Sequence, residues 1–125
     1  MKLDPTTEAR VLALATHIDG KPVQMPDTRP VAERVSEADF QAAVIELAKA
    51  NGWKHFHVYN SRKSVAGWPD LVLVRGPTLL FMELKSHDGV VEADQQNWIE
   101  ALTAAGQAVY IVRPRDWMQI EAMLK

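Results

Sequence analysis

An aspartate, a glutamate and a lysine are spaced in this chain so that one β-hairpin can bring them together. Asp70 and Glu83 are separated by two apolar, β-branched stretches, and Arg75-Gly76-Pro77-Thr78 between the stretches is typical of a hairpin turn. With a loop of two or four residues, Asp70 lies opposite Glu83 on one face of the sheet. Lys85 shares that face, because side chains alternate along a strand. A loop of three residues would place the two carboxylates on opposite faces.

Such a cluster poses an electrostatic problem that a cation can solve. Two carboxylates about 5 Å apart repel each other by roughly 3 kcal/mol at an effective dielectric constant of 20. Mg²⁺ prefers oxygen ligands, and it polarises a phosphoryl oxygen and activates a bound water. A neighbouring ammonium stabilises the charge that develops on the phosphorus centre. The three residues therefore suit phosphodiester hydrolysis, and the alternative is an ordinary hairpin with a salt bridge at its edge.

Composition sets the class of protein. With 125 residues and 14.0 kDa, we expect one core-forming domain. We expect neither a transmembrane helix nor a signal peptide, because no apolar run approaches 18 residues. The chain has no cysteine, which excludes disulfides and thiolate metal sites and fits a reducing cytoplasm. The net charge of −2 argues against a nonspecific nucleic-acid coat protein, although not against an enzyme that handles phosphates locally.

The first 35 residues are predicted to form an arm outside the main domain. Asp4-Pro5 resembles a helix start, and the helix is expected to run to about Thr16. The segment from Ile18 to Val35 contains three prolines and no apolar period, so we predict a loose connector.

Residues 36–125 are predicted to form an α/β domain. Apolar residues at three- and four-residue spacing predict helices, and β-branched runs predict strands. The expected elements are a helix from Ser36 to Asn51-Gly52, strands at Trp53–Tyr59, Leu71–Arg75 and Leu79–Leu84, a helix from Glu92 to Gly106, a strand at Ala108–Val112 and a helix from Pro114. This order predicts a mixed sheet with helices on both faces. Trp98 and Trp117 occupy apolar helix positions and are predicted to lie in the core.

The motifs in this order resemble a known family of nucleases. Gly67-Trp68-Pro69-Asp70 followed by Glu83-Leu84-Lys85 is similar to the signature of the PD-(D/E)XK superfamily, and more narrowly to the VRR-NUC family of small phage and bacterial nucleases. Glu37, at the start of the first core helix, and Gln95, in the helix after the lysine, match two further family positions. The resemblance covers roughly Ser36 to Lys125.

This resemblance implies a fold, an activity and a set of roles. The fold is restriction-endonuclease-like, with core order αβββαβ and here an extra C-terminal helix. The activity is that of a Mg²⁺- or Mn²⁺-dependent DNA endonuclease, and stand-alone members are linked to cleavage of Holliday junctions. Asp70, Glu83 and Glu37 would be metal ligands, Lys85 the catalytic lysine, and Gln95 a supporting residue. Rival hypotheses are a flap- or restriction-type nuclease and a catalytically silent DNA-binding module. An enzyme this small that cuts two strands is expected to be a homodimer.

Several other side chains have two interpretations each. Glu37 could instead favour the helix dipole, and Gln41, one turn further on, could reach the site or face solvent. His55 and His57 alternate on one strand face, which would permit a zinc or copper pair but more often indicates ordinary polar strand positions. Tyr59 shares that face and could be core or a stacking surface.

The loop before the aspartate combines cations with hydrogen-bond donors. Ser61, Arg62, Lys63 and Ser64 form the mixture that contacts phosphate backbones, and the alternative is a mobile solvated loop. Trp68, in the turn that follows, could pack on the core or against a base.

Overall fold

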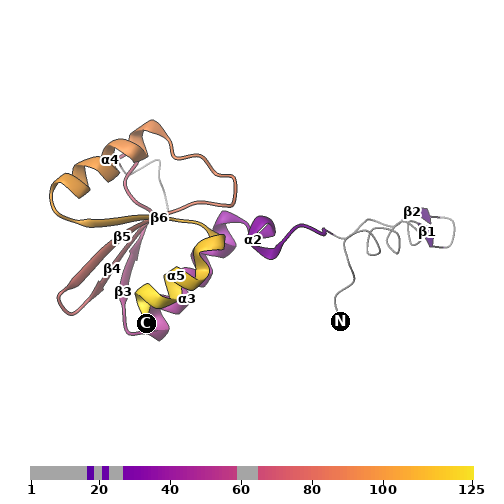
Figure 1. Cartoon of the computed structure of the whole chain (residues 1–125), viewed down its shortest axis with the longest axis horizontal. Helices are drawn as coiled ribbons and strands as arrows, with labels where there is room; N and C mark the ends of the chain where they lie inside the picture. Colours follow the sequence, from indigo (N-terminus) through magenta and orange to yellow (C-terminus); the bar gives the residue numbers. More distant parts are fainter. Residues whose placement is uncertain (1–16, 19–20, 23–26, 59–64) are drawn as a thin grey trace.

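The computed structural model describes residues 17–18, 21–22, 27–58 and 65–125 (Figure 1). The helix predicted from Asp4 to Thr16 and the cationic loop after Val58 lie outside the described residues. Two short strands near the N-terminus, β1 (His17–Ile18) and β2 (Lys21–Pro22), pair with each other in antiparallel fashion.

A four-stranded mixed sheet forms the centre of the domain. Its strands are β3 (Lys54–His57), β4 (Leu71–Arg75), β5 (Thr78–Leu84) and β6 (Ala108–Val112), and they lie in the order β3-β4-β5-β6. The first three pair antiparallel, whereas β6 runs parallel to β5. The parallel pair requires a crossover, which helix α4 (Ala93–Ala104) supplies. The mixed α/β sheet flanked by helices is thus confirmed.

The hairpin between β4 and β5 has the register that a two-residue loop requires. Leu71 pairs with Met82, and the pairing continues to Arg75 opposite Thr78. Only two residues remain for the turn, and Gly76 adopts a positive φ of 55°. The next position beyond Leu71 and Met82 therefore sets Asp70 opposite Glu83.

One face of the sheet carries the hydrophobic core. Helices α3 (Glu37–Ala50) and α5 (Trp117–Leu124) cover this face, and Figure 1 shows them together on the side opposite α4. The Ser36 hydroxyl caps α3 by accepting a hydrogen bond from the Asp39 N–H at 3.1 Å. The core consists of buried apolar side chains from α3, α5, the sheet and the residue before β3: Phe40, Val44, Ala48, Trp53, Leu71, Leu73, Leu80, Met82, Leu84, Val112, Ile120 and Leu124. Trp117 packs against it partly buried.

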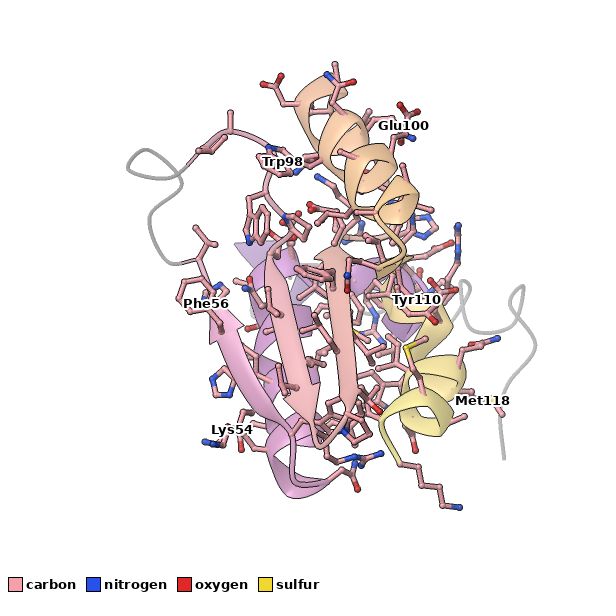
Figure 2. The ribbon with its side chains drawn as sticks, turned by 90° about the vertical axis from the view of Figure 1, so that its left-hand side faces the viewer. Lys54, Phe56, Trp98, Glu100, Tyr110 and Met118 are labelled. Carbon is pink, nitrogen blue, oxygen red and sulfur yellow. The ribbon has the colours of Figure 1, made fainter. Side chains whose placement is uncertain are left out.

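The opposite face is covered only at one end. Figure 2 looks onto this face and shows α4 crossing the end where β4 begins and β5 finishes. None of the residues of α4 is buried, and Trp98 is half-exposed rather than part of the core that we predicted. The reason is that α4 lies on the face of the sheet away from the core cluster, where Trp98 packs edge-on against Trp68. Further down this face Phe56 is 62% exposed.

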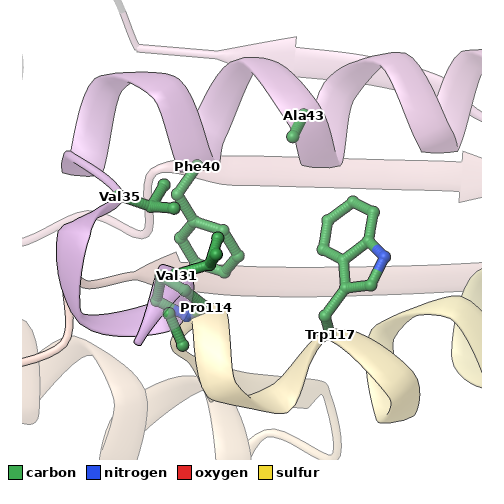
Figure 3. A pocket seen from close by; sticks show the side chains of 7 residues that line it. Val31, Val35, Phe40, Ala43, Pro114 and Trp117 are labelled. Carbon is green, nitrogen blue, oxygen red and sulfur yellow. The ribbon is translucent and has the colours of Figure 1, made fainter. Parts of the chain in front are cut away.

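The segment predicted as a loose connector contains a short helix. Helix α2 (Val31–Arg34) follows Pro30, and Val35 after it packs against the core. Between α2, α3 and the 3₁₀ turn η2 (Pro114–Asp116) lies an apolar cavity of about 330 Å³ (Figure 3). Phe40 and Trp117 line it. The contacts of α2 are tertiary, which explains why an apolar period in the local sequence did not indicate them.

The final helix begins at Pro114, as predicted, but its first turn is the 3₁₀ turn η2 and α5 follows. Among the described residues, no helix has the length and apolar character needed to cross a membrane.

Candidate active site

The two hairpin carboxylates meet at the end of the sheet, on the face away from the core. Along β5, Met82 and Leu84 point into the core, so Glu83 between them points to the other face. Glu83 has no exposed surface, and Lys85, two residues on, is 7% exposed. Oδ2 of Asp70 accepts a hydrogen bond from the backbone N–H of Leu84 at 2.9 Å. The predicted trio of acid, acid and lysine is therefore assembled on one face.

Glu83 is a carboxyl group in a strongly perturbed environment. Burial raises its pKa to about 8, and the negative charge of the neighbouring Asp70 acts in the same direction. The ammonium of Lys85, with Nζ 3.7 Å from Oε1 of Glu83, lowers the pKa but does not outweigh burial. In the metal-free protein at neutral pH, Glu83 therefore holds a proton, and its 3.7 Å contact with Lys85 is not a full ion pair.

Gln95 fixes the orientation of Glu83 from above the sheet. Its Nε2 donates to Oε1 of Glu83 at 2.8 Å. Its Oε1 accepts the backbone N–H of Glu92 at 2.8 Å, as part of the capping box that starts α4. The amide can satisfy both bonds in one orientation only. Gln96 is directed elsewhere and donates to Glu100, so the structure distinguishes the two adjacent glutamines.

The turn before Asp70 is pressed against the start of α4. Gly67 has a φ of 88°, and a Cβ atom there would lie 2.3 Å from the carbonyl carbon of Asp94. Only glycine satisfies both the backbone conformation and this close approach. Trp68 packs edge-on against Phe81, with ring centroids 5.7 Å apart, and against Trp98 at 5.0 Å. Of the two interpretations of Trp68, packing within the protein is the one observed.

The donor set suits a hard divalent cation. Oε2 of Glu83 is buried and has no hydrogen-bond partner among the described residues, and the carboxylate of Asp70 lies beside it. A buried oxygen without a partner is costly, and a cation held with Asp70 would satisfy it. In the part of the chain that the structure describes, no group of three or more His, Asp or Glu side chains is arranged to hold a metal. The hairpin would therefore supply two carboxylates, and water, phosphate or a further side chain would complete the coordination shell.

A comparison with models of known protein families identifies the family of this chain. A family model described as the VRR-NUC domain matches residues 24–116, a stretch that includes Asp70, Glu83, Lys85 and Gln95. The chain belongs to the VRR-NUC family. This is a nuclease domain family of the restriction-endonuclease-like superfamily, so nuclease chemistry and DNA binding are the functions that the family indicates. Comparisons with curated proteins and with solved structures gave no match.

Glu37, suggested by the VRR-NUC pattern, and Gln41, one turn further along α3, do not join the hairpin trio. Glu37, exposed on the first turn of α3, contributes repulsion that raises the pKa of Glu83, and its role as an additional ligand stays a prediction. Gln41 lines a groove of about 360 Å³ beside β3, and no residue that the structure describes forms a hydrogen bond with its buried Nε2. His57 lines the same groove.

The structure places the histidine pair, whereas the cationic loop lies outside the described residues. His55 and His57 pair with Leu73 and Leu71, so they lie on the face opposite Glu83 and away from the VRR-NUC site. Tyr59 and the loop with Ser61, Arg62, Lys63 and Ser64 lie outside the described residues, and their roles stay predictions. The strand that leads into this loop is close to the site, because the N–H of Val58 donates to the carbonyl of Asp70 at 3.4 Å.

Sequence reasoning missed the contribution of Trp98. Its indole Nε1 donates to the carbonyl of Ala66 at 3.1 Å, directly before the Gly67 turn. The available signal was its position three residues after Gln95, which places both side chains on one face of a helix.

Proposed function

We propose that the protein is a divalent-metal-dependent DNA endonuclease that hydrolyses phosphodiester bonds. The observation that supports this most is the buried, unpartnered oxygen of Glu83 beside Asp70, with Lys85 on the same face. No core-packing requirement explains why two acids and a lysine share a nearly dry end of a sheet. A site for a cation and a phosphate explains all three.

Asp70 and Glu83 would hold Mg²⁺ or Mn²⁺, with Glu37 as a further ligand. When bound, the cation would polarise the scissile phosphate and favour ionisation of the attacking water. Lys85, held at 3.7 Å from Glu83, would orient that water and neutralise charge on the pentavalent phosphorus. Gln95 would keep Oε1 of Glu83 occupied, so that Oε2 is the oxygen directed to the cation.

Glu83 must lose a proton before it can act as a ligand. Because its pKa is raised to about 8, cation binding at neutral pH would release this proton. Affinity for the cation would therefore increase with pH up to about this value. Burial thus makes the site depend on pH as well as on metal concentration.

For the substrate we propose branched DNA, with the four-way junction cut by a homodimer in the cytoplasm. The support is the family's link to junction cleavage and the size of the domain, which offers one site for one strand. Two copies would supply the two cuts that a junction needs. The cationic segment containing Arg62 and Lys63, which follows the strand next to Asp70, would contact the phosphate backbone.

One assay tests the activity and the substrate together. Labelled four-way junction, flap, duplex and single-stranded DNA are incubated with the protein in Mg²⁺, Mn²⁺ or EDTA, beside an Asp70→Asn variant. We expect cleavage of the junction with either cation, no cleavage with EDTA, and none by the variant. Preferred cleavage of a flap or duplex would replace the substrate proposal. Binding without any cleavage would instead identify a silent DNA-binding module.

A further inference from the structure

We propose that Trp98 is a positioning residue, whose indole fastens the turn before Asp70 to helix α4 and so sets the spacing of the two carboxylates. The inference rests on the proposed function, because the spacing matters only if a cation binds between Asp70 and Glu83. Trp98 itself contacts neither of them in any bond or ring contact of the described residues. It acts through the backbone of the turn.

The side chain of Trp98 attaches the turn before Asp70 to helix α4. Nε1 of Trp98 donates to the carbonyl of Ala66 at 3.1 Å, and its ring lies edge-on to Trp68 with centroids 5.0 Å apart. Figure 2 shows Trp98 on the side of α4 nearest the chain that enters β4. Gly67, between these two contacts, abuts the backbone of Asp94 with no room for a Cβ atom. The turn is thus held at consecutive residues, only two positions before Asp70.

Helix α4 is also attached to Glu83, the second carboxylate of the site. Gln95, one helical turn before Trp98, donates to Oε1 of Glu83 at 2.8 Å. Helix α4 therefore contacts both segments that carry an acid. The Trp98 side chain holds the aspartate segment, and the Gln95 side chain holds the glutamate.

The contacts of helix α4 also resist an electrostatic repulsion between the two carboxylates. Asp70 and Glu83 lie opposite each other one position beyond the Leu71–Met82 pair, so their charges repel whenever both are ionised. Helix α4 has no buried residue that would anchor it by hydrophobic burial alone. Specific contacts therefore contribute to its position, and the indole bond and ring contact of Trp98 are among them. Without them the turn and the helix can separate, and the carboxylates with them.

Trp98→Phe tests the role, and the chain offers a matched control. The variant keeps an aromatic ring beside Trp68, although a smaller one, and removes the indole N–H bond to Ala66. Trp53→Phe removes the same kind of bond, because Nε1 of Trp53 donates to the carbonyl of Leu124 at 2.9 Å in the core. We expect Trp98→Phe to weaken Mn²⁺ binding, measured by calorimetry without DNA, by about tenfold, the low end for residues that orient metal ligands. We expect Trp53→Phe to lower the melting temperature and leave Mn²⁺ affinity unchanged.

Cleavage kinetics supply a second readout. Loss of positioning should raise the Mn²⁺ concentration needed for half-maximal cleavage by Trp98→Phe and lower kcat, with KM for DNA unchanged. A purely structural role would lower the melting temperature while leaving Mn²⁺ affinity and kcat at wild-type values, and this result would overturn the proposal. Absence of Mn²⁺ binding by the wild-type protein would overturn the proposed function as well, so the two failures are distinct.

A measurement on the wild-type protein tests the proposal even if the Trp98→Phe variant does not fold. Coupling between two sites is reciprocal, so a cation that is helped by the Trp98 bond must also strengthen that bond. We expect saturating Mg²⁺ to slow solvent exchange of the Trp98 indole proton, followed by NMR, and to leave the Trp53 proton unaffected. Equal exchange of the Trp98 proton with and without bound Mg²⁺ would overturn the inference.

Discussion

The backbone N–H of Leu84 donates to Oδ2 of Asp70 over 2.9 Å, so the first carboxylate is tied to the strand that carries the second. The bond extends the pairing of β4 and β5 one position past Leu71 and Met82. Asp70 therefore has a structural task and a chemical task in the same side chain. Substitutions there must be chosen to separate the two.

The variants Asp70→Asn and Asp70→Ala should separate the structural task of Asp70 from its chemical task. Both remove a carboxylate, so both should abolish cleavage in Mg²⁺. The asparagine retains an oxygen for the Leu84 N–H and removes the charge beside Glu83, so above about pH 8, where Glu83 is ionised, its metal-free melting temperature should equal or exceed that of the wild type. The alanine leaves that N–H without its acceptor, at a cost of about 1–3 kcal/mol, and should melt lower. Calorimetric melting in EDTA checks both, and cleavage by Asp70→Asn at the wild-type rate would contradict the nuclease assignment.

Glu83 should make the stability of the metal-free protein depend on pH. Its pKa is about 8 in the folded protein, against about 4.3 in an unfolded chain. Between these values the folded state binds the additional proton, so the free energy of unfolding decreases as pH rises through this window. The melting temperature in EDTA should fall by several degrees from pH 5 to pH 8.

Glu83→Gln should remove the part of the pH dependence of the melting temperature that Glu83 contributes, because an amide does not titrate. Glu121→Gln, at an exposed position of α5, is the matched control and should keep the wild-type slope. A wild-type melting temperature that rises over this window would mean that Glu83 is ionised throughout.

Gln95 and Gln96 offer a test with adjacent residues of the same type. Gln95→Ala removes the donor to Oε1 of Glu83 and one half of the α4 capping box. We expect Mn²⁺ affinity and cleavage to fall by about tenfold or more. Gln96→Ala removes only an exposed bond to Glu100 and should leave both at wild-type values. Equal effects of the two substitutions on Mn²⁺ affinity would argue against a specific role of Gln95.

Lys85→Met should separate metal binding from chemistry. The ammonium is not a ligand, so Mn²⁺ binding should persist while cleavage is lost. Lys85 also lowers the pKa of Glu83, so its removal should raise that pKa and shift metal binding to higher pH. Lys49→Met, on the exposed side of α3, should change neither property. Cleavage by Lys85→Met at the wild-type rate would restrict this lysine to a structural role.

Arg62 and Lys63 are predicted to bind phosphates. Each phosphate contact that is lost should reduce the slope of log affinity against log salt concentration by about 0.9 on duplex DNA. The double alanine variant is compared with Arg115→Ala, Lys125→Ala, which removes two exposed charges near the C-terminus. Fluorescence anisotropy in EDTA, which prevents cleavage, measures both slopes. An unchanged slope for the first variant would exclude the contact.

The hairpin site was predictable because strand geometry leaves few choices. Two apolar runs and a Gly-Pro turn determine the register, and the alternation of side chains then places Asp70, Glu83 and Lys85 on one face. The elements of the sheet followed from the same patterns, with boundaries that differ by a few residues at β3.

The parts that depend on tertiary packing were not predictable. Helix α2 is short, and its position is set by contacts with α3 and η2 rather than by its own sequence. Trp98 resembled a core residue because an apolar helix position does not reveal what the helix crosses. The burial that raises the pKa of Glu83 depends on α4 and the Gly67 turn closing over the end of the sheet, which no local pattern contains.

All three reactive groups lie on one hairpin, from Asp70 to Lys85, so they meet as soon as that hairpin forms. This is a contact of low sequence separation, which the chain can make early in folding. Two ionised acids would oppose this step, and the proton that Glu83 retains at neutral pH removes the opposition. Strongly alkaline buffer without divalent ions should therefore slow refolding selectively at this hairpin. The proton on Glu83 and a cation in the site are thus alternative ways for the chain to tolerate the same pair of acids.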